Sequence, residues 1–398
     1  MQLSRFYHGH NLYGLSRHPD FYIFELAIWL HTLARSLISI FIPILLLKAG
    51  YSISNVIIFY LLLNVIDVPL NFAVDWLIRK IGAKRVMILA TLAMIAFFAV
   101  LGILPPSSWP LLILLAFLAA AYDTLFWIAH IYIFIETNRE GLDTGRTVGA
   151  LEGIRKFANV VGPLVGAFVL LTIGKVPLIA ISIVVFALSI IPLFKLRHAR
   201  DIPNDKRTPF REFFSNNQEK KNYLSVALWG IHNEAEDILW PLFIFTIFGS
   251  IGSVAAVPVI VSLTTAVLSY FAGTLTRRYG NRMIILGSVL IASVWIFRIT
   301  TQDPILYYVT VFLVGFFSLL VMIPIDGSVT ARGLKLESLT TSTYRNAASM
   351  ALRIPFYLIL IVSVEVFKVS FVIAALSLFS ILAVTVLLRA SGQKYHPA

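Results

Sequence analysis

The chain has 398 residues, of which 59% are hydrophobic and 13% are charged, and its mean hydropathy is +0.86. A soluble domain usually has about 25% charged residues, so this composition predicts an integral membrane protein. The absence of cysteine excludes disulfides, thiolate metal sites and a cysteine nucleophile. The net charge of +12 indicates the positive-inside bias of a membrane protein, and we expect no nucleic-acid partner.

Apolar runs of about 20–28 residues predict membrane-spanning helices, because about 20 helical residues cross the hydrocarbon layer. We predict an all-α membrane protein with twelve transmembrane helices in two pseudo-symmetric six-helix bundles. The predicted spans are residues 21–47, 53–78, 85–104, 109–136, 147–172, 176–195, 222–248, 252–276, 282–300, 304–331, 340–365 and 369–389.

The polar segment 196–221 is the predicted linker between an N-terminal bundle (1–195) and a C-terminal bundle (222–398). With both termini in the cytoplasm, cytoplasmic segments hold 23 of the 32 Lys and Arg residues, and the outer loops hold three. This bias predicts a multi-pass protein of the cell membrane with both termini cytoplasmic. Arg298 is near the outer end of its span, where its head group is expected to reach the membrane surface.

Within the linker, Thr208 and Pro209 are residue types that often begin a helix. Phe210, Phe213 and Phe214 then share one helical face. This pattern predicts a short amphipathic helix on the inner leaflet, with a solvated connector as the alternative.

The two halves of the sequence share features at a fixed offset. Three pairs are 198 residues apart in equivalent spans: the runs 79–82 and 277–280, Pro43 and Pro241, and Arg155 and Arg353. A two-fold repeat with its axis along the membrane normal is typical of transporters.

The twelve spans, the central linker and the loop after the second span together resemble the major facilitator superfamily. The family's loop motif has the form GxxxDRxGRR. Asp75 is at its first Gly position and Arg79 at its Asp position, whereas Gly82, Lys84 and Arg85 match it. The second copy contains Gly273, Arg277, Gly280 and Arg282. The resemblance implies a gating loop that locks the halves together on the cytoplasmic side in the outward-open state.

The fifth span contains Gly162, Pro163 and Gly166, in an order that resembles the GxxxGPxxGG motif of the family's antiporters. This resemblance favours export. Close helix packing is the alternative explanation for the small residues. The fourth span reads Leu118 to Asp123 where standard proton–drug antiporters have RxxQG.

Charged side chains inside the spans are candidate functional residues, because burial of a charge in the bilayer costs several kcal/mol. The candidates for substrate binding or proton coupling are His31, Arg35, Asp67, Asp123, His130, Glu152, Arg155, Lys156, His232, Asn233, Glu236, Asp237 and Arg353. We predict no metal site and no cofactor.

A polar stripe follows one face of the second span: its members are Tyr60, Asn64, Asp67, Asn71 and Asp75. We expect Asp67, roughly 18 Å from the cytoplasmic end, either to line the pathway and titrate or to form a structural pair with a base.

Arg35 is expected to neutralise Asp67 or to bind an anionic group, and pairing is the favoured role. His31 is either a proton relay or a hydrogen-bonded core side chain. Glu152 either lines the pathway or pairs within its helix with Arg155 and Lys156.

The seventh span holds three acids within four positions, so not all of them can face lipid. Helical spacing places Glu234 and Asp237 on one side and His232 and Glu236 on another. Glu236 or Asp237 is the candidate for proton coupling in this half. In the tenth span, Asp326 is expected to pair near Arg332.

These patterns predict a secondary transporter that works by alternating access, with proton-coupled export of small amphipathic compounds as the favoured activity. A lipid flippase, or uptake of a sugar or an organic anion, is the alternative. An enzyme is not expected, because HExxH, GxSxG and nucleotide-binding GxxxxGK[ST] motifs are absent. The expected partners are a small-molecule substrate, protons and membrane lipids, and the protein is expected to be a monomer.

Overall fold

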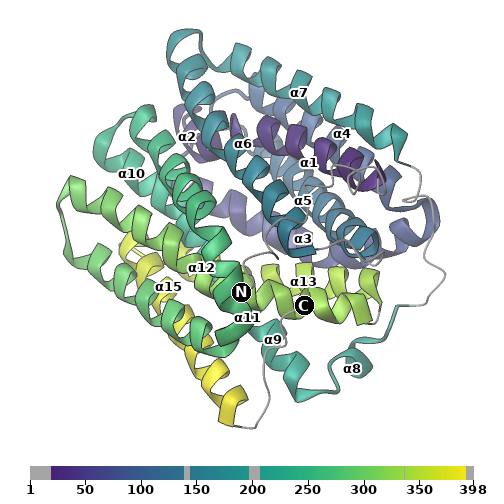
Figure 1. Cartoon of the computed structure of the whole chain (residues 1–398). Coiled ribbons are helices and arrows are strands. Elements are labelled where there is room, and N and C mark those ends of the chain that lie inside the picture. The colour runs from purple at the N-terminus through teal and green to yellow at the C-terminus, as the bar shows by residue number, and fades with distance from the viewer. Residues whose placement is uncertain (1–18, 139–143, 197–206, 336, 391–398) are drawn as a thin grey trace, which may run out of the picture.

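The computed structural model describes residues 19–138, 144–196, 207–335 and 337–390. These residues are helical or in short connections, and they include no β-strand. Helices α1 to α7 gather on one side of the molecule and α9 to α15 on the other (Figure 1). The all-α, two-bundle fold that the sequence predicts is confirmed.

The N-terminal half contains α1 (Pro19–Ser36), a 3₁₀ turn η2 (Ser39–Phe41), α2 (Ile42–Lys48), α3 (Ile53–Ile81), α4 (Ala83–Ile103), α5 (Trp109–Asn138), α6 (Thr144–Thr172) and α7 (Lys175–Lys195). A four-residue helix, α8 (Phe210–Phe213), follows. We call the end of the molecule where α7 ends and α9 begins the linker end.

The C-terminal half contains α9 (Asn217–Glu234), the π-helix η4 (Ala235–Leu239), α10 (Trp240–Phe248), α11 (Ile251–Thr300), α12 (Pro304–Lys335), α13 (Ser338–Ala351), α14 (Arg353–Ile361) and α15 (Val366–Ala390). α11 comprises two helices that meet at a kink, where Gly280 has φ 9° and ψ −91°.

Among the described residues, eight helices are long and apolar enough to cross a membrane. Shorter apolar helices cover residues 156–172 and 251–267. The other two predicted spans, 222–248 and 340–365, are the most polar, and each is broken: one by η4 and the other between α13 and α14. Broken helices within a membrane are tolerated where they line a cavity or are buried in protein.

The same break occurs in the first and seventh spans. α2 begins just before Pro43, and α10 begins just before Pro241, so each proline occupies the first turn of a new helix. Proline lacks the N–H that would continue the preceding helix. The 198-residue offset in the sequence therefore corresponds to a shared structural feature of the two halves.

The glycines of the fifth span permit a close crossing of α6 over the end of α1. A Cβ on Gly162 would lie 1.9 Å from Ser36 Oγ, and one on Gly166 would lie 1.9 Å from the Leu37 carbonyl oxygen. Ser36 Oγ also donates to the Ala158 carbonyl at 3.0 Å. Close packing therefore accounts for these glycines without reference to the direction of transport.

The helix predicted in the linker is α8, but its aromatic side chains bind protein. Phe213 is 4% exposed, and its ring centroid lies 4.6 Å from that of Tyr344 and 5.4 Å from that of Tyr223. Thr208 makes no side-chain cap, since Pro209 occupies the N-cap position. The prediction of a helix lying on the membrane is wrong for Phe213, because a pocket of tyrosine rings takes up its apolar surface.

Candidate functional site

Polar side chains of α3 meet those of α13 and α14 along an antiparallel contact between the two halves. As residue numbers rise along α3, those of the facing residues fall. The contacts are a stack of Tyr60 on Tyr357 with ring centroids 6.0 Å apart, Asn346 Nδ2 donating to Asn71 Oδ1 at 2.9 Å, Thr343 Oγ1 donating to Asp75 Oδ1 at 3.1 Å, and Arg79 Nη2 donating to Thr340 Oγ1 at 3.4 Å. We call these four contacts the polar zipper. The polar stripe predicted on α3 thus faces the other half of the protein.

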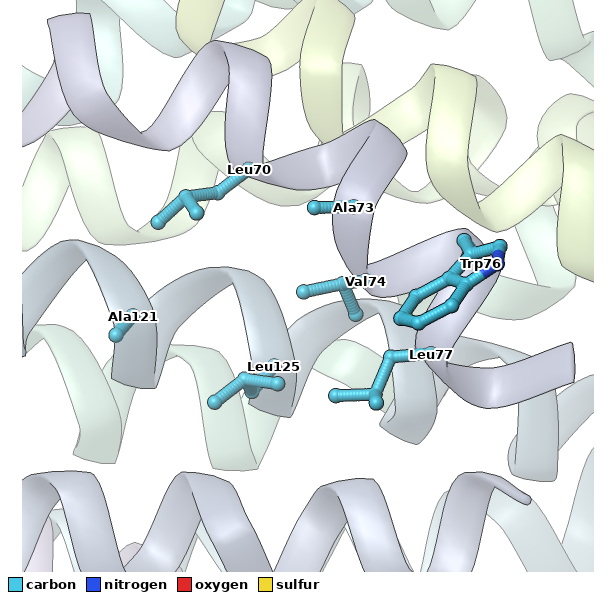
Figure 2. A pocket seen from close by; sticks show the side chains of 7 residues that line it. All are labelled: Leu70, Ala73, Val74, Trp76, Leu77, Ala121 and Leu125. Atoms are coloured by element: carbon cyan, nitrogen blue, oxygen red, sulfur yellow. The ribbon is translucent and has the colours of Figure 1, made fainter. Parts of the chain in front are cut away.

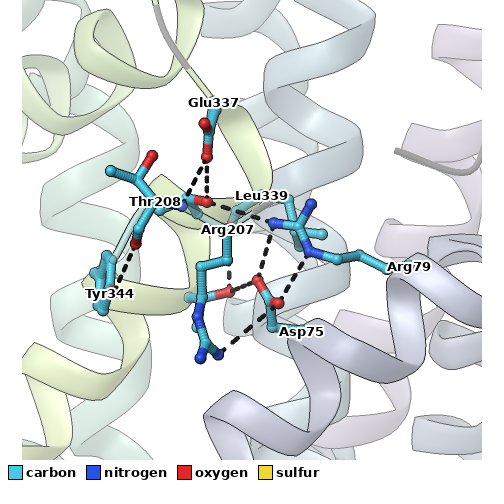
Figure 3. Close-up of polar contacts among 9 residues, drawn as sticks. Asp75, Arg79, Arg207, Thr208, Glu337, Leu339 and Tyr344 are labelled. Carbon is cyan, nitrogen blue, oxygen red and sulfur yellow. Dashed lines mark hydrogen bonds and ion pairs between the residues drawn. The ribbon is translucent and has the colours of Figure 1, made fainter. Parts of the chain in front are cut away.

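At the linker end, Asp75 is the centre of the zipper's charged contacts (Figure 3). Its Oδ2 lies 3.0 Å from Arg79 Nε and 3.9 Å from Arg207 Nη1. Asp75 and Arg79, the two residues that depart from the family motif, therefore pair with each other one turn apart, and both also contact α13.

The linker residue Thr208 is hydrogen-bonded to α13 and to the residue before it, close to Asp75. Glu337 accepts hydrogen bonds from the Thr208 main-chain N–H at 3.3 Å and from Thr340 Oγ1 at 2.6 Å. Tyr344 donates its hydroxyl to the Thr208 carbonyl at 2.9 Å (Figure 3). This cluster joins α3, the linker and α13 at one point.

Other residues of the predicted gating loop lie elsewhere. Lys84 Nζ donates to the Phe194 carbonyl at 2.9 Å and so binds the end of α7 within its own half. Gly82 allows the turn after α3 with φ 84°, and Arg85 is exposed. In the second copy, Gly280 forms the kink and Arg282 is exposed. Gly273 and Arg277 belong to α11, but their surroundings lie outside the described part.

Asp67 occupies the midpoint of the 29-residue helix α3 and is fully buried. Its Oδ1 accepts a short hydrogen bond from Thr124 Oγ1, and Asn71 Nδ2 lies 3.4 Å from the same oxygen. Its Oδ2 has no hydrogen-bond partner. Asp123 of α5 lies close enough for the two carboxyl groups to hydrogen-bond when one of them carries a proton.

Arg35 does not neutralise Asp67, so the favoured expectation for that pair is wrong. The Arg35 guanidinium lies 5.9 Å from the centre of the Trp127 ring, and its electrostatic neighbours include Asp123 and Asp237. Neither Asp123 nor Asp237 lies within ion-pair distance of Arg35. The geometry of α1 and α5 directs Arg35 along the face of Trp127 instead.

Arg353 of α14 is paired within the C-terminal half. Its Nη1 lies 2.6 Å from Glu234 Oε1, and the Tyr357 hydroxyl donates to Glu234 Oε2. Glu234 is not among the candidate residues from the sequence, although it forms the ion pair that holds the candidate Arg353 in place. The only signal in the sequence was the crowding of acids in the seventh span.

Glu236 forms a second, fully buried pair in this half. Its two oxygens accept from Arg298 Nη1 at 2.5 Å and Nη2 at 3.1 Å, and Arg298 Nε donates to Thr310 Oγ1 at 2.9 Å. The guanidinium carbon lies 3.7 Å from the centre of the Trp240 ring. Arg298 is 2% exposed, so it does not extend to the membrane surface as predicted. The bidentate bond to Glu236 holds it inside the bundle.

The π-helix η4 lies within the seventh span, at the residues for which regular helical spacing predicts two faces. Its i→i+5 bonding inserts one extra residue into the turn. Glu236 is buried against Arg298, whereas Asp237, the next residue, is exposed. Asp237 has no ion pair among the described residues. His232 accepts from Trp295 Nε1 at 3.0 Å, so it packs with the Arg298 cluster.

The histidines of the N-terminal half lie in an aromatic layer. His31 Nε2 shares a 2.7 Å hydrogen bond with the Tyr122 hydroxyl, and its ring stacks on Phe126 at 4.0 Å. His130 stacks on the other side of Phe126 at 5.5 Å. Both histidines are buried, which favours the hydrogen-bonded core role for His31.

The remaining candidates are less fully described. Lys156 and Asn233 are half-buried. Glu152 and Arg155 belong to α6, but their side chains lie outside the described part, so their predicted pairing stays a prediction. No group of three possible metal ligands occurs among the residues that were described.

An apolar groove lies between α3 and α5, apart from the charged residues (Figure 2). Its lining is Leu70, Ala73, Val74, Trp76, Leu77, Ala121 and Leu125. Trp76 is 59% exposed, so this groove opens on the outer surface of the helices. A lining without polar side chains offers nothing to orient a polar solute.

Among the charged groups of the described spans that have no ion-pair partner, four interact with one another: Arg35, Asp67, Asp123 and Asp237. They come from α1, α3, α5 and η4, and electrostatic interactions link them across the two halves. We call them the central charge group. Three acids and one base can bind protons or a cationic group.

Comparison with known proteins supports the fold and the class of function. The family model described as Major Facilitator Superfamily matches residues 25–332. The human organic anion transporter MFSD10 (TETRAN) is 12% identical, with a TM-score of 0.66 over 92% of this chain and 99% of its own. No curated protein sequence matches the chain.

Two further solved structures have a similar fold. A bacterial homologue of the human drug peptide transporters PepT1 and PepT2 is 12% identical, with a TM-score of 0.66 over 93% of this chain and 97% of its own. The transporter FucP, in the outward conformation, is 13% identical, with a TM-score of 0.65 over 92% of this chain and 98% of its own. The family consists of transporters rather than enzymes. The chain therefore belongs to the Major Facilitator Superfamily, and it is a multi-pass membrane protein and a secondary transporter of small molecules.

Proposed function

We propose that the protein exports small amphipathic organic molecules across the cell membrane in exchange for protons, with both termini in the cytoplasm. It acts as a monomer surrounded by lipid. The orientation rests on the 23 to 3 distribution of basic residues, and the direction rests on the resemblance of the fifth span to antiporter sequences.

The observation that carries proton coupling is the state of Asp67. A fully buried carboxylate without a cationic partner is costly in a membrane interior. A proton removes this cost, and Asp123 beside it can share that proton. Release of the proton requires a different environment, which movement of the two halves past each other supplies.

Alternating access requires the polar zipper to part at one end at a time. At the linker end its contacts are single hydrogen bonds and one bidentate charge pair within α3, each worth only about 0.5–3 kcal/mol. They can therefore break and re-form within a transport cycle. The large buried pair of Glu236 and Arg298 lies within one half and can stay intact throughout.

Transport by purified protein in proteoliposomes tests the proposal. An imposed pH gradient, with a panel of dyes, drugs, sugars and lipids, is expected to drive movement of amphipathic compounds. Asp67→Asn is expected to reduce gradient-driven flux at least about tenfold, since general proton-transfer roles contribute factors of this order or more. The matched control is Glu365→Gln, an exposed acid already paired with Lys368.

Flux that keeps its pH dependence in Asp67→Asn, with Asp123→Asn equally active, contradicts proton coupling through this pair. Flux of sugars or phospholipids alone supports one of the alternatives, uptake or lipid flipping. Size-exclusion profiles of each variant verify that lost flux does not come from misfolding.

A further inference from the structure

We infer that the middle of the polar zipper, at Asn64 and Asp67, binds a protonated amine of the transported molecule through its N–H groups. This inference rests on the proposed function and names the chemical class of its substrate.

The zipper is paired on both sides of this point and unpaired at it. On one side Tyr60 stacks on Tyr357, and on the other Asn71 bonds Asn346. Between these contacts, Asn64 and Asp67 share the same face of α3, three residues apart, and neither bonds a residue of the opposite half.

Two buried acceptors are left there without a donor. Asn64 is 1% exposed and Asp67 is 0% exposed, and neither Asn64 Oδ1 nor Asp67 Oδ2 has a hydrogen-bond partner. The orientation of the Asn64 amide is fixed, because its Nδ2 donates at 2.8 Å to the Tyr60 carbonyl, which can only accept. Buried acceptors without donors cost free energy, so a ligand that donates to both gains affinity.

The opposite helix makes no hydrogen bond to Asn64 or Asp67, and the unpaired donor Arg353 Nε lies against Gly230 of its own half. α13 ends at Ala351 and α14 begins at Arg353, so the backbone of the eleventh span is interrupted here. Arg353 is held by Glu234 at 2.6 Å in its own half, and Leu352 between the helices is apolar. By the order of the zipper contacts, the unpaired stretch of α3 lies level with the junction of α13 and α14.

Charge selects an amine among the possible donors. Separate N–H groups of one ammonium can donate to Asn64 Oδ1 and to Asp67 Oδ2. Its charge then forms the close ion pair that Asp67 lacks, since Arg353 acts on this carboxylate only from beyond ion-pair distance. A hydroxyl donates one hydrogen and leaves the charge unbalanced, and an anionic group is repelled. The neighbouring Tyr60 and Tyr357 rings add attraction for a cation and for the apolar part of an amphiphile.

The same assignment gives exchange its mechanism. Asp67 can hold a proton or the ammonium group, but not both, so each ligand displaces the other. One proton entering for each monovalent cation leaving also conserves the charge of the site.

The test uses two probes that differ only in N–H groups: monodansylcadaverine, a fluorescent primary amine, and its N,N,N-trimethyl derivative. Equilibrium binding to purified full-length protein in nanodiscs is measured by fluorescence at neutral pH. Wild-type protein is expected to bind the amine at least about tenfold more tightly, because charge-assisted hydrogen bonds are lost in the trimethyl form.

Three variants assign the effect to the site. Asn64→Leu is expected to weaken amine binding about tenfold and to leave the trimethyl derivative unchanged, since only one acceptor is removed. Asn64→Asp keeps an acceptor and is expected to retain the preference for the amine. Asn55→Leu, on the same helix near its N-terminus, is the matched control and is expected to match wild type.

Equal binding of the two probes to wild type, absence of saturable amine binding, or equal behaviour of Asn64→Leu and Asn55→Leu overturns the inference. Failure here is separate from failure of the proposed function. If Asp67→Asn abolishes gradient-driven flux but wild-type protein binds the two probes equally, proton coupling is supported and the assignment of an amine substrate is wrong. If the amine preference holds but flux ignores the pH gradient, the coupling falls.

Discussion

Two buried acids of the membrane interior, Asp67 in α3 and Glu236 in η4, have opposite surroundings. Glu236 is bonded by both its oxygens to Arg298, which itself lies between two tryptophans. Asp67 has one neutral hydroxyl donor at close range, and one of its oxygens has no partner. The comparison teaches that burial alone does not identify a working acid. The presence or absence of a fixed counter-charge distinguishes a structural carboxylate from one that is free to exchange its ligand.

The largest effect is expected from Glu236→Gln. It leaves the Arg298 guanidinium buried without a counter-charge, which costs about 3–5 kcal/mol. We expect severe loss of thermal stability in detergent, measured by the fraction of protein that stays monodisperse after heating. Asp67→Asn removes a carboxylate with no fixed partner, so its stability is expected to equal or exceed that of wild type.

A double variant tests whether the lost stability comes from the unpaired charge of Arg298. Replacement of both partners, Glu236→Leu with Arg298→Met, removes the charges together and is expected to recover much of the stability. Equal losses in Glu236→Gln and Asp67→Asn would show that the two acids are equivalent, and the comparison would fail.

Periodicity within one helix was enough to predict the polar stripe of α3 and the repeat between the halves. Pro43 and Pro241 mark the same break because the effect of proline on a helix is local. Partners could not be predicted in this way. Glu236 and Arg298 are 62 residues apart, and only the packing of α11 against the seventh span brings them together.

The π-helix of the seventh span is a feature that the sequence did not predict. Regular spacing of 3.6 residues places Glu236 with His232, and both side chains do lie in the Arg298 cluster. The π-helix itself covers Ala235–Leu239. No residue type in Ala235–Leu239 demands a π-helix. Its residue Glu236 makes the bidentate bond to Arg298, a long-range contact that sequence spacing does not reveal.

An intermediate effect is expected from Asp75→Asn at the linker end. Asp75 is buried like Asp67 but is paired with Arg79 at 3.0 Å and bonded by Thr343. Loss of about 1 kcal/mol from these contacts corresponds to a roughly fivefold shift toward a separated linker end. Because the chain has no cysteine, Ser342→Cys is a clean reporter: Ser342 is fully buried between the zipper residues Thr340 and Thr343, and its hydroxyl bonds only its own helix. Its maleimide labelling is expected to accelerate by that factor.

Two controls interpret that labelling rate. Asp75→Glu keeps the charge and is expected to label at nearly the wild-type rate. Unchanged labelling in Asp75→Asn would indicate that the zipper does not hold the halves together, and that Asp75 serves only its own helix.

The smallest effect is expected from Asp326→Asn. Asp326 pairs with Arg345 at 2.8 Å, not with Arg332 as the sequence suggested, since Arg332 is taken by Glu219 at 3.0 Å. The side chains of Asp326 and Arg345 are 40% and 25% exposed, so solvent screens the pair and its contribution is about 0–1 kcal/mol. We expect a thermal stability within that range of wild type, and a difference that shrinks further in high salt. If Asp326→Asn destabilises the protein as much as Glu236→Gln, the contribution of an ion pair to stability does not depend on its exposure to solvent. The contrast between Glu236 and Asp67 would then have no physical basis.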